Sequence, residues 1–146
     1  MKISLPDINV LIALHDPAHL GHEKAHRRFR SEVRNGWATC PLTENGFVRV
    51  LSQPQYPNNV DSVAVALHIL QNMVSTYAAN HQFWHDSPSL RDSTLFHASA
   101  IAGPKQIADV YLLGLCQYNG GRLITLDAGI NSLAIPSPDS DLLCVL

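Results

Sequence analysis

The chain has 146 residues, of which 46% are hydrophobic and 15% are charged, and its formal net charge at pH 7 is -2. This composition is typical of one globular domain over residues 1–146, long enough to bury a core without a disulfide or a structural metal. No apolar run approaches the ~18 residues of a membrane span, and no signal-peptide pattern follows Lys2. We therefore expect a soluble, cytoplasmic protein. The slight negative charge excludes a protein that coats nucleic acid by charge alone.

The opening residues alternate between apolar runs and turn-forming residues. A short apolar run ends at Pro6, Asp7 follows at once, and a second apolar run begins at Asn9. This order predicts a strand, a turn and a helix over residues 3–14. Asp7 then lies at the carboxyl end of a strand, where it either caps the helix or belongs to a ligand site.

The remaining helices and strands are predicted from the spacing of apolar residues. Helical spacing predicts helices over residues 23–34, 43–51, 61–74, 90–102 and 107–116, with Thr43 as the cap of the second of these. Short apolar segments predict strands at 37–40, 81–84, 122–126 and 142–145. Helices that alternate with four or five short strands indicate an α/β fold, with a mostly parallel sheet covered by helices on both faces.

Three cysteines and two tryptophans occur in apolar surroundings. Cys40, Cys116 and Cys144 are odd in number and widely spaced, so we expect buried free thiols in a reducing compartment. Trp37 and Trp84 lie in or beside predicted strands and are expected in the core rather than as platforms for bases.

Four acidic residues share one local setting, since each lies at a strand end, at a helix start, or at both. They are Asp7, Glu44, Asp109 and Asp127. The carboxyl ends of parallel strands meet at one edge of a sheet, so these side chains are expected to converge. Like charges ~4 Å apart repel by about 4 kcal/mol at an effective dielectric constant of 20, and a divalent cation relieves that repulsion. Oxygen ligands favour Mg2+ or Mn2+.

A metal held by carboxylates predicts hydrolysis of phosphodiester bonds. Such a site activates water and neutralises phosphate without a serine or histidine nucleophile. Each acid also has a simpler interpretation, because acids favour the first turn of a helix. Asp109 fits that interpretation least well, because it lies among apolar neighbours. The hypothesis of a metal site therefore depends on the four acids together.

Four segments resemble the PIN-domain ribonucleases, particularly the VapC-type toxins of bacterial toxin-antitoxin pairs. The segments are LPDINVLIAL, PLTENGFVRVLS, GPKQIADVYLLGLC and GGRLITLDAGI, which stand in the order and at the intervals of that family and span the chain nearly end to end. The resemblance implies a three-layer α/β/α sandwich and an endoribonuclease that depends on a divalent metal. It also implies a homodimer that is neutralised by a cognate antitoxin.

The resemblance also assigns roles to particular residues. It places the metal and catalytic positions at Asp7, Glu44, Asp109 and Asp127. Asn9 is implied to order the water around the metal, and Thr43 to orient the second acid or contact substrate. Asn131, four residues after Asp127, is a further candidate to approach the metal through water. The sequence departs from the family at Ala108, where a hydroxyl residue is common, and at Ala128, where a basic residue is common.

Two further groups of polar residues have alternative interpretations. The histidines at positions 15, 19, 22 and 26 have near-helical spacing, but Asp16, Pro17 and Gly21 interrupt the helix that a zinc site would need. We expect them to be surface and capping residues. The arginines between positions 27 and 34 form either a solvated face or a contact for the antitoxin or for RNA.

Two other functions compete with the ribonuclease hypothesis. A phosphatase of the haloacid-dehalogenase type also has an aspartate after a strand, but it requires a second aspartate two residues later, where this chain has Asn9. A catalytically silent PIN-fold module would bind RNA or a protein without cleaving, and the presence of all four acids argues against it.

Overall fold

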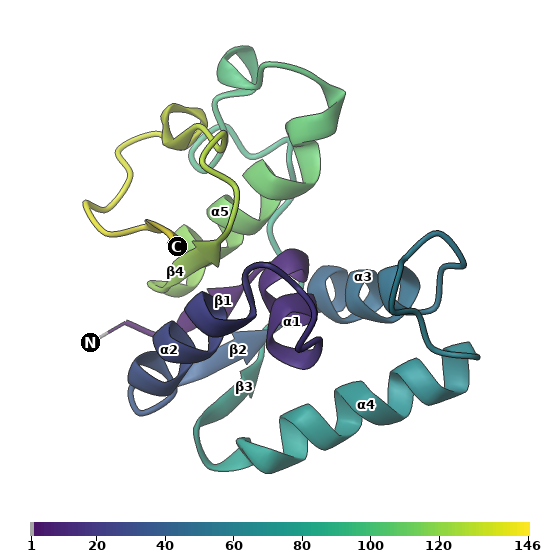
Figure 1. The fold of residues 1–146 in the computed structure, drawn as a ribbon. Coiled ribbons are helices and arrows are strands. Elements are labelled where there is room, and N and C mark those ends of the chain that lie inside the picture. The colour runs from purple at the N-terminus through teal and green to yellow at the C-terminus, as the bar shows by residue number, and fades with distance from the viewer. Residues whose placement is uncertain (1) are drawn as a thin grey trace.

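The computed structural model describes residues 2–146, and its centre is a five-stranded sheet in the order β3-β2-β1-β4-β5 (Figure 1). All neighbouring strands run parallel. The strands are β1 (Ser4–Pro6), β2 (Trp37–Thr39), β3 (His81–Phe83), β4 (Arg122–Thr125) and β5 (Leu143–Val145). The helices are α1 (Ile8–His15), α2 (His22–Glu32), α3 (Pro41–Leu51), α4 (Val63–Thr76) and α5 (Ile107–Asn119). Short 3-10 helices are η1 (Ala78–Asn80), η2 (Ala98–Ala100), η3 (Pro104–Gln106) and η4 (Ser132–Ala134).

The sheet is the middle layer of a three-layer α/β/α sandwich, as the sequence predicts. On one face Leu5, Ala38 and Leu123 pack with residues of α5 and of the C-terminal segment. On the other face Trp37 and Ile124 pack with residues of α1, α2, α3 and α4. Successive residues of a strand point to opposite faces, so each short strand contributes to both halves of the core.

Local signals in the sequence explain where the helices begin and end. Asp7 is the N-cap of α1, and its side chain accepts a hydrogen bond from the Val10 amide. Gly120 ends α5 in the left-handed conformation at φ 67°, which glycine adopts without steric cost. Gly46 brings α3 close to α1, because an added Cβ would lie 2.2 Å from Cδ1 of Ile8.

The helix predicted over residues 90–102 is wrong. This segment consists of turns and the 3-10 helix η2. The Asp92 side chain accepts a hydrogen bond from the Thr94 amide at 2.9 Å, and the His97 amide donates to the Ala134 carbonyl at 2.7 Å. Both contacts take backbone donors away from a helical ladder, which is how aspartate commonly favours a turn over a helix.

The predicted start of α3 at Thr43 is also wrong, because the helix begins at Pro41 after Cys40 in the N-cap position. Pro41 fits the first helical turn, where no amide donor is needed. Thr43 lies three residues after the cap, and its hydroxyl accepts a hydrogen bond from the Cys40 amide at 3.0 Å.

The cysteines are free thiols, as predicted. Cys40 and Cys116 are buried, whereas Cys144 is only half-buried. Trp37 and Trp84 are core residues, with 0% and 6% of their surface exposed. None of the helices within residues 2–146 combines the length and the apolar character required to cross a bilayer.

Candidate functional site

Asp7 occupies the turn between β1 and α1, at the carboxyl edge of the sheet. Its side chain is 5% exposed, and both carboxylate oxygens accept hydrogen bonds. Oδ1 accepts from the Val10 amide at 3.0 Å, and Oδ2 accepts from the Thr125 hydroxyl. Each carboxylate oxygen has two acceptor positions, so both oxygens keep capacity for a cation or a water.

Thr125 connects Asp7 with Asp127 at the end of β4. It is fully buried, and its hydroxyl accepts a hydrogen bond from the Asp127 amide at 3.0 Å while it donates to Asp7. The Asp127 side chain accepts from the Gly129 amide at 2.7 Å, which fixes the turn after the strand. Thr125 is absent from the residues that the sequence assigned to the site. The sequence feature that could have identified Thr125 is a hydroxyl residue two positions before an acid of the predicted site.

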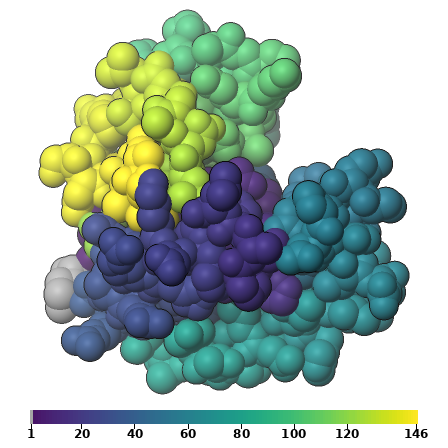
Figure 2. Space-filling model, viewed as in Figure 1, coloured from purple at the N-terminus to yellow at the C-terminus, as the bar shows by residue number. Residues whose placement is uncertain are grey.

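Asp109 approaches from the first turn of α5, on the opposite face of the sheet from α1. Asp7 and Asp109 line one cavity of about 190 Å³, together with Asn9 and Arg49. The surface is hollowed between the green residues of the second half of the chain and the α3–α4 part (Figure 2). The helix that carries Asp109 has no side-chain cap, because Gln106 in the N-cap position makes no such hydrogen bond.

The three aspartates influence one another electrostatically. Burial raises the pKa of Asp7, hydrogen bonds from Thr125 and Val10 oppose that shift, and the charges of Asp109 and Asp127 raise the pKa further. Burial also raises the pKa of Asp109, and the charge of Asp127 adds to that shift. Asp7 and Asp109 therefore line one cavity at this edge of the sheet, and Thr125 connects Asp7 with the backbone of Asp127.

Glu44 has different neighbours. It lies on α3 and accepts a hydrogen bond from the Thr39 hydroxyl at 2.5 Å, and Thr39 in turn contacts Nε2 of His81 at 2.9 Å. Glu44 is not among the residues that line the cavity of Asp7 and Asp109. The fourth predicted acid thus lies at the β2–β3 side of the carboxyl edge, with partners of its own.

The donors at this site fit a hard divalent cation. They are carboxylate oxygens that repel one another, and the nearby Asn9 adds an amide oxygen. Within residues 2–146, however, no three carboxylate, imidazole or thiol side chains are close enough to hold one ion together. This spacing suits Mg2+ better than an ion that requires a full protein cage, because Mg2+ keeps several waters and binds through one or two carboxylates.

Relatives of the chain identify its family. No protein-family model matches it, but it is 41% identical to ribonuclease VapC44 of Mycobacterium tuberculosis over 143 residues, which cover 98% of this chain and 99% of that protein. It is 36% identical to ribonuclease VapC38 of the same organism over 146 residues, which cover 99% and 100%. For ribonuclease VapC39 the identity is 38% over 127 residues, which cover 87% and 90%. The chain belongs to the VapC family of PIN-domain toxins.

The resemblance of the four segments to VapC proteins is thereby confirmed, and the structure places the remaining residues that it implied. Asn9 is exposed at the cavity beside Asp7. Asn131 caps η4, since its side chain accepts from the Leu133 amide at 2.9 Å. Thr43 is fully buried and bonds the Cys40 backbone, so the hydroxyl that contacts Glu44 belongs to Thr39.

The VapC chain uses two of its early histidines to cap α1. Ring nitrogens of His22 and His26 donate to the carbonyl oxygens of Ala13 and Leu14, at 2.7 and 2.8 Å. The expected capping role is confirmed for this pair, because a carbonyl oxygen only accepts hydrogen bonds.

Proposed function

We propose that this protein is an endoribonuclease that hydrolyses phosphodiester bonds of RNA with Mg2+ or Mn2+, and that it acts as the toxin of a toxin-antitoxin pair. One observation carries the proposal. Asp7 and Asp109 line one cavity at the carboxyl edge of the sheet, and Thr125 bonds both the Asp7 carboxylate and the Asp127 amide, in a chain of the VapC family. We propose the same four acids, including Glu44, as the catalytic and metal-holding residues.

The chain's own residues prepare this site for a cation and a phosphate. Thr125 and the N-terminus of α1 hold the Asp7 carboxylate in one orientation, and the helix terminus favours its ionised form. Asp109 and Asp127 would add negative charge that attracts a divalent ion, and Asn9, which lines the same cavity as Asp7, would hold a water beside that ion. A bound Mg2+ or Mn2+ would supply the positive charge that activates water and neutralises the phosphodiester.

A catalytically silent RNA-binding module is the remaining alternative, since it would keep the same fold. The two functions differ in one respect, which is whether metal-dependent cleavage is lost when a carboxylate becomes an amide. A phosphatase is less well supported, because Asn9 stands where that chemistry requires a second acid.

The test compares amide substitutions inside and outside the site. Asp7→Asn and Asp109→Asn each keep the side-chain shape but remove a negative charge, so we expect RNA cleavage with Mn2+ to fall at least ~100-fold while the circular dichroism spectrum stays unchanged. Asp61→Asn is the matched control, because Asp61 is exposed and lies in the loop before α4. Full cleavage by either site variant, with metal present, would contradict the proposal.

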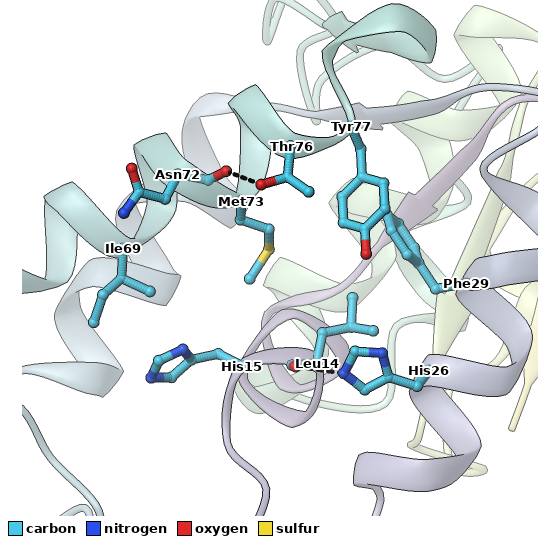
Figure 3. Close-up of a pocket in the computed structure, with 9 residues that line it drawn as sticks. All are labelled: Leu14, His15, His26, Phe29, Ile69, Asn72, Met73, Thr76 and Tyr77. Carbon is cyan, nitrogen blue, oxygen red and sulfur yellow. Dashed lines mark hydrogen bonds between the residues drawn. The ribbon is translucent and has the colours of Figure 1, made fainter.

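We also propose the groove between α1, α2 and α4 as the antitoxin contact. It has a volume of about 400 Å³, and Figure 3 shows Met73 facing Leu14 across it, with the ring of Phe29 beside that of Tyr77. An apolar groove of this kind accepts apolar side chains of a partner segment. Half of the ten lysines and arginines lie between Lys24 and Arg34, on or just after α2, and they favour an acidic partner. A homodimer remains part of the proposal.

A further inference from the structure

The side chains of Glu44, Thr39 and His81 are joined by two hydrogen bonds and form a hydrogen-bonded chain. The Thr39 hydroxyl lies 2.5 Å from Oε2 of Glu44 and 2.9 Å from Nε2 of His81. Thr39 is fully buried at the end of β2, and Glu44 and His81 are half-buried. The chain therefore links strand β3 through strand β2 to helix α3.

The chemistry of the three groups fixes the direction of these bonds. An ionised carboxylate only accepts, so the single hydroxyl hydrogen of Thr39 points to Glu44. His81 must then donate, which places a proton on its Nε2. Burial lowers the pKa of His81, while the charge of Glu44 opposes that shift. Nε2 stays a donor in the neutral tautomer and in the charged ring alike, so the chain does not depend on a titration.

Neighbouring residues hold the far end of the chain in place. The His81 ring lies against the indole of Trp37, with the ring centroids 4.6 Å apart, and the two residues are register partners in the sheet. Trp37 is fully buried, and its indole NH donates to the Tyr77 carbonyl at 3.1 Å. The donor that reaches Thr39 thus packs against a fully buried core residue.

We propose that Thr39 and His81 are positioning residues that orient Glu44 for the metal, a role that rests on the proposed function. Thr39 donates to Oε2, His81 holds the Thr39 hydroxyl, and Oε1 has no hydrogen-bond partner among residues 2–146, so Oε1 is the oxygen available to a metal or to its water. Partners behind a ligand carboxylate typically change metal affinity or activity 10–100-fold when they are removed.

The test is a pair of matched substitutions at each position, with Mn2+ affinity measured by titration calorimetry and cleavage measured separately. Thr39→Val keeps the shape but removes the hydroxyl, and we expect Mn2+ binding to weaken ~10–100-fold. Thr39→Ser keeps the hydroxyl and should stay within ~3-fold of the wild type. At the second position, His81→Gln keeps an N–H donor at the same reach and should resemble the wild type, whereas His81→Leu should bind Mn2+ about tenfold more weakly.

The results separate a positioning role from a structural one. If Thr39→Val does not fold, the comparison of His81→Gln with His81→Leu still tests the positioning role. His81 lies on the edge strand β3, where a substitution disturbs the sheet less. Equal Mn2+ affinity within both pairs, in a protein whose wild type binds Mn2+ and cleaves RNA, would overturn the positioning role alone. A wild type that neither binds Mn2+ nor cleaves RNA would overturn the proposed function, and this inference with it.

Discussion

Two buried aspartates at the ends of α1 show that the neighbours of a carboxylate decide whether its pKa rises or falls. Both Asp7 and Asp16 are 5% exposed. Burial and neighbouring acids raise the pKa of Asp7, whereas hydrogen bonds from Tyr56, Asn58 and the Ala18 amide lower the pKa of Asp16. Asp16 is therefore a structural carboxylate that ties two loops together, while Asp7 has the destabilised charge typical of a functional site.

Removing the Tyr56 hydroxyl should destabilise the protein in a pH-dependent way. The folded-state pKa of Asp16 lies below its ordinary value of 3.8, so its contribution to stability is complete above that value and is lost as the pH falls through the folded pKa. We expect Tyr56→Phe to lower the free energy of unfolding by about 1.5–3 kcal/mol at pH 7, with a smaller loss at pH 3. Urea unfolding at both pH values measures this.

Tyr118→Phe is the control for this experiment, because Tyr118 is 58% exposed. We expect less than about 0.5 kcal/mol of change from it at either pH. A loss for Tyr56→Phe that is the same at pH 7 and pH 3 would show that the Tyr56 hydroxyl does not act through the charge of Asp16.

At the scale of elements, the packing of α1 against α3 sets the position of the site. Gly46 lies over Ile8, the residue that follows Asp7, and no side chain fits between the two helices. The contact fixes the start of α1 relative to α3. Since α1 carries Asp7 and α3 carries Glu44, one close helix contact determines the spacing of two of the proposed site acids.

Gly46→Ala should destabilise the wild-type protein, but it should stabilise a variant in which Ile8 is shortened. The added methyl would lie 2.2 Å from Cδ1 and 2.6 Å from Cγ1 of Ile8, so we expect a loss of about 1–2 kcal/mol, the balance of overpacking against the higher helix propensity of alanine. In an Ile8→Ala background the clash is absent, and the same substitution should stabilise by up to about 1 kcal/mol. Thermal unfolding of the four variants of this cycle measures the coupling.

Gly103→Ala provides the matched control, because nothing lies within 4 Å of its added Cβ and its backbone is extended at φ 175°. It should leave the thermal midpoint nearly unchanged. Additive effects of Gly46→Ala and Ile8→Ala would contradict the proposed clash.

A negative charge in the groove between α1, α2 and α4 should weaken antitoxin binding without changing RNA cleavage. Met73 is half-buried in this groove, away from the cavity of Asp7 and Asp109. We expect Met73→Glu to weaken antitoxin binding at least ~10-fold, because a desolvated carboxylate replaces an apolar contact. Two quantities are measured: the affinity for the proposed antitoxin, which is sought in a small adjacent reading frame, and RNA cleavage by the protein alone.

Gln71→Glu is the control, because Gln71 is exposed on α4 and does not line the groove. Unchanged antitoxin affinity for Met73→Glu would place the antitoxin on another surface. Lost cleavage in that variant would connect the groove to the active site.

At the scale of the whole molecule, the proposed metal should stabilise the fold. A ligand that binds only the folded state adds about 2.7 kcal/mol at a concentration 100-fold above its dissociation constant, which is about 5–10 °C in the thermal midpoint for a domain of this size. We expect Mg2+ or Mn2+ to raise the midpoint of the wild type by this amount, measured by scanning calorimetry.

Asp109→Asn should lose most of this shift, because it removes one of the clustered charges. NaCl at equal ionic strength serves as the second control, since it screens charge without binding the site. An equal shift with NaCl, or an undiminished shift in Asp109→Asn, would count against a metal at these acids.

The sequence by itself determined the fold class and the strand positions, and it supplied the four acids that we propose for the site. Short apolar runs predict each strand, and acids after them identify the carboxyl edge, because these signals are local. The segment over residues 90–102 was predicted incorrectly, since its backbone donors bond an aspartate side chain and a distant carbonyl. Only the tertiary structure decided which residues meet. Thr125 bonds Asp7 across 118 positions of the sequence, and His81 bonds Thr39, the partner of Glu44, across 42 positions. No local pattern records either of these two long-range contacts.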